Sequence, residues 1–296
     1  AKEEGFVDLR FAKAKFLEKE AKRLESWLRK GFQGQMKYLN NHFEKRTNPE
    51  NLVPGTKTIA VFAHNYYPES NLLSSGKYKI ARYAYGKDYH KVIKKKLKRI
   101  YQSLKTFDSS IEGRYFVDSA PILERDWARR SGLAWTGKNT LSIHPKRGSY
   151  FFLAIMMLNV EIPEDTPIDD HCGTCRRCIE ACPTQAIAEE GYEMDGSKCI
   201  SYLTIELKDE SIPTSFKKNM DQWIFGCDIC QEVCPWNKFS IRHNEHQFIP
   251  KSSLLNMNDQ DWIELNEEKF NQLFEGSAVK RTKFMGLKRN IKFITE

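Results

Sequence analysis

All eight cysteines of the 296-residue chain fall in one segment of its second half. Four follow the spacing Cys-x2-Cys-x2-Cys-x3-Cys-Pro, three follow Cys-x2-Cys-x3-Cys-Pro, and one stands alone between the two runs. Such runs are typical of bacterial 4Fe–4S proteins, in which the last cysteine of a run ligates the other cluster. The thiols concerned are Cys172, Cys175, Cys178, Cys182, Cys199, Cys227, Cys230 and Cys234.

Two four-iron clusters account for all of these thiolates. Three thiolates on one tight loop can hold three irons of a cube, and the fourth iron takes its ligand from elsewhere. The lone Cys199 joins the second cluster by elimination, since eight thiolates for two such clusters leave none over. We predict cluster one on Cys172, Cys175, Cys178 and Cys234, and cluster two on Cys182, Cys199, Cys227 and Cys230.

Disulfides and zinc are the two other interpretations of so many cysteines. A disulfide framework suits small secreted domains, whereas this chain is large and shows no secretion signal. Zinc sites usually show two separated pairs of cysteines rather than a run of three closed by Cys-Pro. Both alternatives explain the spacing less well than iron–sulfur clusters in a reducing compartment.

A folded scaffold must position these ligands, and the apolar periodicity of the chain predicts its elements. Strands that alternate with helices indicate a layered α/β or α+β domain up to about Val160. The predicted helices cover Asp8–Gly31, Asp88–Phe107, Glu124–Ser131 and Asp259–Phe274. The predicted strands cover Thr58–His64, Arg114–Asp118 and Gly148–Leu158.

The composition changes at an acidic, proline-rich stretch from Glu161 to Asp170, which indicates a linker. We therefore predict an α+β chain with an N-terminal α/β domain over residues 1–165 and a ferredoxin-like domain with two 4Fe–4S clusters over residues 166–240. A helical, basic segment over residues 241–296 completes it. The N-terminal domain should hold whatever the clusters reduce, because an electron relay needs a terminal acceptor.

The formal net charge of +8 and the hydrophobic fraction of 40% are those of a globular protein that could accept an anionic partner. No apolar run approaches the roughly 20 residues that span a bilayer, and no signal peptide is evident. We therefore expect a cytoplasmic protein without a membrane partner. The basic runs Lys94–Arg99 and Lys280–Lys292 are candidate phosphate contacts, with an ordinary solvated face as the alternative for each.

The stretch from Val117 to Gly148 is the richest in residue types that do chemistry. Asp118 ends a predicted strand, where sheet proteins commonly place site residues, although a helix N-cap or turn is the commoner role of such an aspartate. The alternative for Arg129 and Arg130 is a solvated helix face. No G-x-G-x-x-G, P-loop, H-E-x-x-H or G-x-S-x-G motif occurs, so none of those sites is predicted.

This stretch and several others together resemble the epoxyqueuosine reductase family. The others are EKRTNPENLVPG, ARYAYGKDYH, the first cysteine run, CISYLTIE and CDICQEVCPWN, and the resemblance extends from about Gly31 to Asn290. It implies an oxidoreductase with cobalamin and two 4Fe–4S clusters. Such an enzyme reduces the epoxide of epoxyqueuosine at the tRNA wobble position to an alkene, which is the last step of queuosine formation.

The resemblance also implies roles for individual residues. The catalytic acid of the family matches Asp118, which would lie at the cobalamin and protonate the epoxide oxygen. The implied cobalamin is base-off, with electrons reaching it from cluster one through cluster two. The other residues that match its contacts are Arg46, Ala81, Ser142, Tyr202 and Thr204.

The expected partners are tRNA carrying epoxyqueuosine in its anticodon and an unidentified low-potential electron donor, and we expect a monomer. Three alternatives remain open at this point. They are a corrinoid reductive dehalogenase, a non-catalytic ferredoxin-type electron carrier and a flavin-dependent iron–sulfur reductase.

Overall fold

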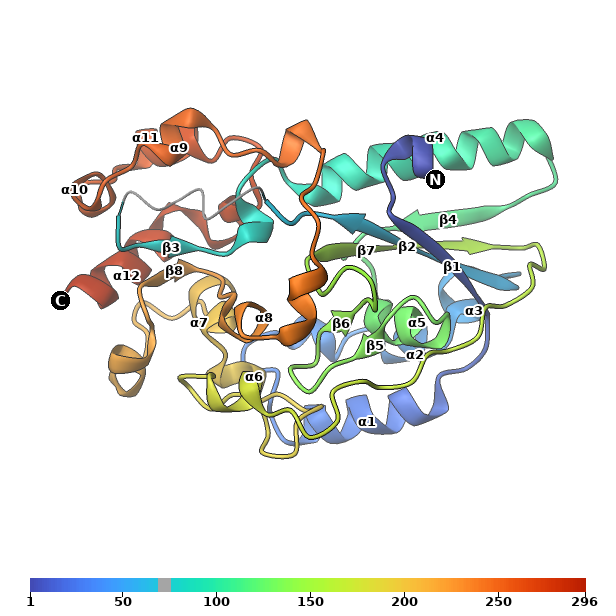
Figure 1. Ribbon diagram of the computed structural model, residues 1–296, viewed down its shortest axis with the longest axis horizontal. Coiled ribbons are helices and arrows are strands. Elements are labelled where there is room, and N and C mark those ends of the chain that lie inside the picture. The colour runs from blue at the N-terminus through green and yellow to red at the C-terminus, as the bar shows by residue number, and fades with distance from the viewer. Residues whose placement is uncertain (69–75) are drawn as a thin grey trace.

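A four-stranded antiparallel sheet forms the centre of the N-terminal half in the computed structural model, which describes residues 1–68 and 76–296 (Figure 1). The strands lie in the order β1-β2-β7-β4. The central pair, β2 and β7, runs from Thr58↔Leu158 to Asn65↔Phe151. The four strands are β1 Asp8–Lys13, β2 Thr58–Asn65, β4 Gly113–Phe116 and β7 Phe151–Leu158.

The two faces of this sheet bury two separate cores, because successive side chains of a strand point to opposite faces. Ala60 and Phe62 belong to the core that α4 (Tyr89–Phe107) covers. Ile59 and Val61 belong to the core that α5 (Glu124–Arg130) covers. Figure 1 shows α4 on one side of the sheet and α5 with α1 on the other. The antiparallel pairing makes this half α+β rather than a parallel α/β layer.

The predictions for β2, α4 and α5 are confirmed to within one residue at each end. Asp88 is the N-cap of α4 and accepts a hydrogen bond from the backbone N–H of His90. The other two predicted strands are shorter than expected, since β4 ends at Phe116 and β7 begins at Phe151. Asp118 therefore lies in the loop that follows β4.

The first predicted helix is wrong at its start. Asp8–Lys13 forms β1, the edge strand that pairs with β2, and α1 covers only Glu18–Arg29. Leu9 and Phe11 pack against the core under α4. Pairing with a distant strand outweighed the helix-like spacing of the apolar residues, as tertiary context often does.

Short helices separated by turns carry the cysteines. The segment between Cys199 and Cys227 contains α7 and then β8, which pairs in parallel with β3 of the N-terminal half. This pairing joins the cysteine-rich region to the first half of the chain. The remaining elements up to residue 240 are α2 Phe43–Thr47, α3 Pro49–Leu52, β3 Lys79–Ile80, β5 Trp135–Thr136, β6 Ser142–Ile143, α6 Arg177–Glu180, α7 Ile200–Ile205, β8 Trp223–Phe225 and α8 Ile229–Glu232.

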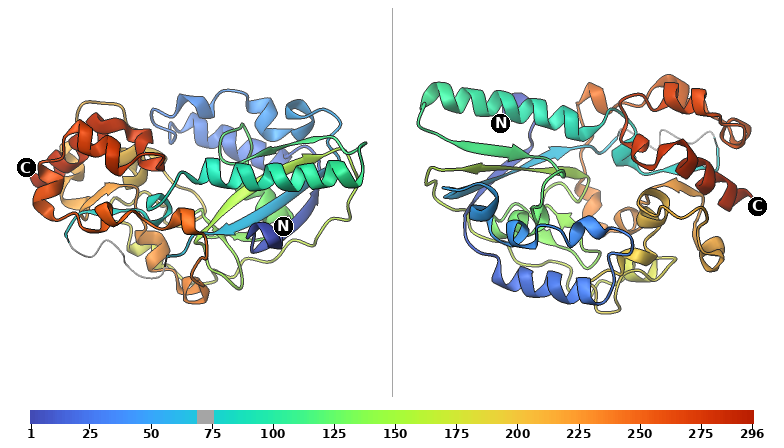
Figure 2. Two further views of the ribbon diagram at one scale, coloured as in Figure 1. Left: turned by 90° about the horizontal axis from the view of Figure 1, so that it is seen from above. Right: turned by 180° about the vertical axis from the view of Figure 1, so that it is seen from behind.

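The C-terminal segment adds four helices and a third core. The predicted helix over Asp259–Phe274 is two helices, because Asn266 caps a new start by accepting from the N–H of Lys269. These helices share their core with Tyr78, Ile80 and Phe225, at the end of the molecule away from the sheet (Figure 2). They are α9 Ser252–Leu255, α10 Asp259–Ile263, α11 Glu267–Leu273 and α12 Lys283–Thr295.

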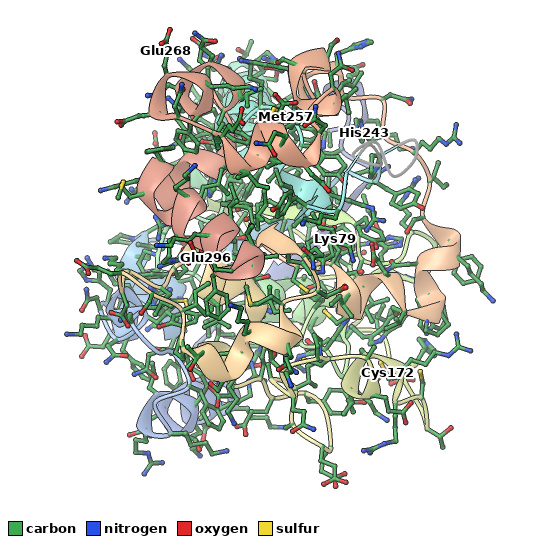
Figure 3. All side chains as sticks on the ribbon, turned by 90° about the vertical axis from the view of Figure 1, so that its left-hand side faces the viewer. Lys79, Cys172, His243, Met257, Glu268 and Glu296 are labelled. Carbon is green, nitrogen blue, oxygen red and sulfur yellow. The ribbon has the colours of Figure 1, made fainter. Side chains whose placement is uncertain are left out.

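Figure 3 views the molecule from this C-terminal end, where Glu268 and Cys172 are labelled at opposite edges. The C-terminal helices therefore pack away from the first cysteine run. The predicted boundaries near residues 165 and 240 stay predictions. Within residues 1–68 and 76–296, no helix is long and apolar enough to cross a membrane.

Candidate functional site

Asp118 lies in the loop between β4 and α5 and presents its carboxylate to open space. Its side chain is 64% exposed, and its φ of +47° places a non-glycine residue in the left-handed region. Its backbone N–H donates to Oε1 of Glu124 at 2.8 Å, and the N-cap position of α5 is Leu123. The helix-cap alternative for Asp118 is thus wrong, and a strained loop holds the residue instead.

The first two residues of α4 face this carboxylate. The Tyr89 hydroxyl donates to Oδ2 of Asp118 at 2.5 Å, and Nε2 of His90 lies 3.6 Å from the same oxygen. The other ring nitrogen of His90, Nδ1, lies 2.7 Å from Oδ1 of Asp88. The second oxygen of Asp118, Oδ1, has no hydrogen-bond partner among residues 1–68 and 76–296, and so it remains open to a substrate.

These contacts shift the proton affinities of the group in opposite directions. The protein around Asp118 would by itself raise the pKa of its carboxyl, but the nearby His90 ring and the hydrogen bond from Tyr89 lower that pKa. Burial and the Asp118 charge raise the pKa of Glu124 to about 8. Burial opposes a charge on His90, but its contacts with Asp118 and Asp88 raise the pKa of His90 to about 9. His90 is therefore charged at neutral pH.

Tyr38 and two arginines form a rim beside this group. The Arg281 guanidinium lies 5.9 Å from the centre of the Tyr38 ring and makes two hydrogen bonds, of 3.1 and 3.0 Å, to the Glu206 carboxylate. Arg46 donates to the backbone oxygen of Tyr38 at 2.9 Å. Tyr38 is within electrostatic range of Asp118. The structure thus brings the predicted residues Arg46 and Asp118 to one side of the molecule.

Tyr202 fastens the segment before this rim to α7. Its hydroxyl accepts a hydrogen bond from the backbone N–H of Gln35 at 2.9 Å. Gly34 has a φ of +53°, and a Cβ there would lie 2.6 Å from the Tyr202 ring. Only glycine satisfies both conditions without a local shift.

Thr204, Ala81 and Ser142 are buried, and their predicted cobalamin contacts stay predictions. The Thr204 hydroxyl donates to the Ile200 oxygen and accepts from the Gly226 N–H, so it supports α7 from within. The Ala81 N–H donates to the Phe225 oxygen. Ser142 lies in β6, two residues after Thr140, whose backbone oxygen accepts a hydrogen bond from Arg125.

The eight thiols come together in the two predicted sets. Cys178 interacts electrostatically with Cys172, Cys175 and Cys234, and burial with these neighbours raises its pKa to about 11. Burial also raises the pKa of Cys230 well above its usual range, and its three strongest thiol neighbours are Cys227, Cys199 and Cys182. Half-buried thiols with raised pKa values lose their protons when a bound cation supplies the opposing charge.

The surroundings of the thiols suit iron–sulfur clusters. All eight cysteines are free, and the Ala186 N–H donates to the Cys182 sulfur at 3.3 Å. The buried Trp135 indole N–H faces Cys172, and its ring packs edge-on against Trp236. Within the described part of the chain, no three His, Cys, Asp or Glu side chains converge to hold a single metal ion.

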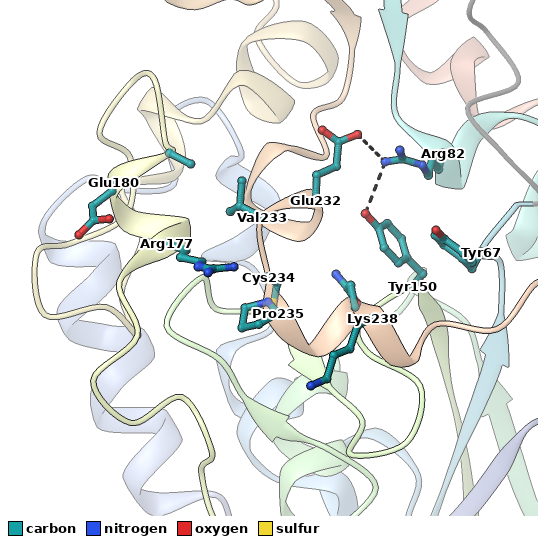
Figure 4. A pocket seen from close by; sticks show the side chains of 12 residues that line it. Tyr67, Arg82, Tyr150, Arg177, Glu180, Glu232, Val233, Cys234, Pro235 and Lys238 are labelled. Carbon is teal, nitrogen blue, oxygen red and sulfur yellow. Dashed lines mark hydrogen bonds and ion pairs between the residues drawn. The ribbon is translucent and has the colours of Figure 1, made fainter.

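An open cleft of about 940 Å³ reaches the first thiol set (Figure 4). Cys234 lines it together with Arg177 and Lys238, which have no acidic partner among the described residues. On its other wall, Arg82 donates to Glu232 at 2.7 Å and contacts the Tyr150 hydroxyl at 3.4 Å. Cysteine sulfur of the first set is therefore close to the protein surface here.

The basic runs divide into paired and unpaired residues. In the first run, Lys96 pairs with Glu245 at 2.7 Å and Arg99 pairs with Glu4. In the second run, Arg289 donates to the backbone oxygens of Leu203, Leu207 and Asp209. These cations make contacts within the protein and stabilise its fold. The solvated-face alternative for Arg129 and Arg130 is also wrong, because both bind the buried Glu20 carboxylate.

Sequence reasoning missed Tyr89, His90 and Glu124 at the site. Asp-Tyr-His at the start of α4 could have indicated the first two, since a tyrosine and a titratable histidine directly follow a helix-capping aspartate. Tyr38 carried no comparable signal. Its role depends on residues far away in the sequence, such as Arg281.

Two family models match the chain. Residues 46–119 match the model described as "Epoxyqueuosine reductase QueG, DUF1730", and residues 171–237 match the "4Fe-4S double cluster binding domain". An epoxyqueuosine reductase of Leadbetterella byssophila is 52% identical over 296 residues, covering 100% of this chain and 96% of that protein. One of Escherichia coli is 39% identical over 295 residues, covering 97% and 76%.

Solved structures resemble this one along nearly its whole length. An epoxyqueuosine reductase bound to an epoxyqueuosine-modified tRNA stem loop superimposes with a TM-score of 0.90 at 28% identity, covering 99% of this chain and 78% of that one. A Bacillus subtilis epoxyqueuosine reductase, described with an aspartate catalytic loop swung out of its active site, gives a TM-score of 0.89 at 27% identity with the same coverage.

Proposed function

The chain belongs to the epoxyqueuosine reductase family, and from this premise we propose that it reduces epoxyqueuosine in the tRNA anticodon to queuosine. The observation that carries the proposal is the exposed Asp118 carboxylate, held in a strained loop by Tyr89 and His90. Its full-length relatives are epoxyqueuosine reductases, so the dehalogenase and electron-carrier alternatives are not favoured. We propose that it acts as a cytosolic monomer.

Asp118 is the proposed proton donor. Opening the epoxide and forming the alkene consumes two electrons and two protons, and the oxygen leaves as water. The free Oδ1 of Asp118 faces the open side of the site, where it can deliver a proton to that oxygen.

Cobalamin, which the family implies, would supply a strongly reducing nucleophilic metal centre. The residues that would hold it are Arg46, Ala81, Ser142, Tyr202 and Thr204. The segment beside them fits such a group, because Oε1 of Gln33 is buried next to the Gly34–Tyr202 contact without a partner in the described residues. The carboxamides around a corrin ring carry N–H donors for it. We propose the base-off form of the cofactor, and His90 is no candidate ligand for its metal because carboxylates face both of its nitrogens.

Two 4Fe–4S clusters on the predicted cysteine sets would supply one-electron transfer. The fold gives this relay a direction, since Cys234 of the first set lines the open cleft. Cys199 of the second set is the N-cap residue of α7, the helix that carries Tyr202 and Thr204. We propose that a low-potential donor delivers electrons at the cleft, and that they leave toward α7.

A stripe of lysines along α4 is the proposed contact for tRNA phosphates. The spacing of i, i+3, i+4 and i+7 puts all four on one face of the helix. All are exposed and have no ion-pair partner in the described residues. The stripe begins one residue after His90, so it would lead the RNA backbone toward Asp118. The four are Lys91, Lys94, Lys95 and Lys98.

The proposed function is tested with the anaerobically reconstituted protein, a low-potential reductant and tRNA that contains epoxyqueuosine. Mass spectrometry of the digested tRNA should show queuosine, and a visible spectrum should show corrin bands in addition to cluster absorbance. Asp118→Asn should keep both clusters and cobalamin yet lower turnover by about 100-fold or more, because it removes the proton donor. Near-normal turnover in that variant would remove Asp118 from the mechanism.

A further inference from the structure

The reaction needs more protons than Asp118 can supply from one carboxyl group. One carboxylic acid carries one proton, whereas alkene and water formation consume two. The exposed side of Asp118 faces the substrate, so a second proton is best supplied from the protein side. The titratable groups on that side are Tyr89, Glu124 and His90. His90, the second residue of α4, is the one of these three that is a cation at neutral pH and faces a carboxylate oxygen of Asp118.

His90 lies between two carboxylates in a fixed position. Its Nδ1 is 2.7 Å from Oδ1 of Asp88, and its Nε2 is 3.6 Å from Oδ2 of Asp118. Asp88 is itself fixed, because the same oxygen accepts the His90 backbone N–H at 3.1 Å. The His90 ring stacks on the Tyr89 ring at 4.0 Å, and that ring stacks on Phe152 at 4.0 Å. The imidazole can therefore shift toward Asp118 only slightly.

We infer that His90 is the proton relay of this site. Asp88 holds its ring in position, and the ring passes protons from solvent to Asp118. The inference deepens the proposed function and rests on it. His90 is a positioning and relay residue, since it acts on the substrate only through Asp118.

The proton transfers balance over one turnover. At rest Asp118 is a carboxylate and His90 an imidazolium. Asp118 takes the proton from Nε2 of His90 and gives it to the epoxide oxygen as the first C–O bond breaks, while Nδ1–H stays bonded to Asp88. His90 takes a proton from water at its exposed edge and passes it through Asp118 to the same oxygen, which leaves as water when the second C–O bond breaks. The two electrons come from the reductant, and a second proton from water returns His90 to the imidazolium and leaves Asp118 a carboxylate, as at the start.

The charges around His90 favour a protonated ring. Asp88 and Tyr89 face it from α4 and Asp118 faces it from the β4–α5 loop, while Glu124 and Arg125 of α5 act on it through Asp118. Burial opposes the charge, but the two flanking carboxylates raise the pKa of His90 to about 9. Because the pKa of the His90 ring is raised, the ring holds its proton below about pH 9 and loses it above that pH.

The test compares His90→Gln with the wild-type holoprotein. Glutamine can reach both carboxylates but offers no acidic proton, so kcat should fall about 100-fold. The KM for tRNA should stay unchanged, and the fall of kcat above about pH 9 should disappear. Added imidazole should restore part of the rate. His246→Gln, an exposed histidine on another element, serves as the matched control and should match the wild type.

A second measurement does not depend on turnover. The titration of His90 by NMR should move from about pH 9 toward its ordinary range in both Asp118→Asn and Asp88→Asn. Wild-type kcat with an intact basic limb in His90→Gln, or an unmoved His90 titration, would overturn the relay. A wild-type protein that forms no queuosine would defeat the proposed function instead.

Discussion

At the scale of single residues, the site depends on one carboxylate whose two oxygens differ. Oδ2 of Asp118 receives the Tyr89 hydroxyl and faces His90, whereas Oδ1 is free among the described residues. An acid that donates from one oxygen and is recharged at the other needs this asymmetry. The loop holds the Asp118 carboxylate in this position at the expense of a strained, left-handed backbone.

Another carboxylate, that of Glu20, is fully buried. It is 0% exposed, and Arg129 and Arg130 of α5 both donate to it, which fastens α1 to α5. Removing one member of a buried ion-pair group is strongly destabilising, because the remaining charges lose their partner. Its burial opposes ionisation, but the Arg130 hydrogen bond lowers its pKa.

Glu20→Ala should therefore lower the free energy of unfolding by about 3–5 kcal/mol, because it leaves two arginines facing a buried gap. Urea unfolding measures this change. Since the folded pKa of Glu20 is below its unfolded value, the contribution is present above about pH 4.5 and is lost as the pH falls through the folded pKa. Glu18→Ala on the same helix removes an exposed pair with Lys22 and should leave the free energy of unfolding nearly unchanged, because solvent screens such a pair. Equal losses in the two variants would contradict this account.

At the scale of elements, two helix starts organise the site. The N-cap of α4 places Asp88, Tyr89 and His90 against the β4–α5 loop, so a capping residue of the helix also fixes the imidazole. The start of α7 follows Cys199 directly, and α7 carries Tyr202 to the segment that holds Arg46. Cys199, a predicted cluster ligand, is thus only a few residues before Tyr202, which contacts the segment beside the rim.

The contact between Gly34 and Tyr202 provides a test of how α7 is connected to the segment before Arg46. Gly34→Ala should lower the free energy of unfolding by about 1–3 kcal/mol in addition to the cost of the strained backbone. The reason is that the new Cβ would lie 2.6 Å from the Tyr202 ring. Gly55→Ala is the matched control, because Gly55 also has a positive φ but no atom within 4 Å of a Cβ. The corrin absorbance per protein should also fall in the first variant alone. Identical behaviour of the two variants would rule out the packing explanation.

At the scale of the whole molecule, we propose separate surfaces for the electron donor and for tRNA. The cleft beside Cys234 lies on the side of the first cysteine set, while the lysine stripe of α4 begins at the Asp118 site. Electron donor and tRNA would then bind without obstructing one another. Most other cations of the two basic runs are used internally, as the pairs of Lys96 and Arg99 show.

Changing all four stripe lysines, Lys91, Lys94, Lys95 and Lys98, to glutamine should weaken tRNA binding. The plot of log affinity against log salt should become shallower by about 0.7 for each phosphate that the variant no longer neutralises. The apparent kcat at saturating tRNA should stay near the wild-type value, because the chemistry at Asp118 is untouched. Lys15→Gln with Lys19→Gln, two exposed lysines at the start of α1, is the control. An unchanged salt slope in the fourfold variant would exclude the stripe as the RNA-binding surface.

The sequence by itself determined the features that local patterns encode. Cysteine spacing predicted two ligand sets because chelating loops are short, and the apolar runs of β2, α4 and α5 predicted the central elements because burial imposes their periods. Tertiary structure alone decided that Asp8–Lys13 is a strand, that Arg129 and Arg130 meet Glu20, and that His90 lies between Asp88 and Asp118. Apart from the adjacent Asp88, these are interactions between residues far apart in the chain. Their free energy depends on distances that no local pattern records.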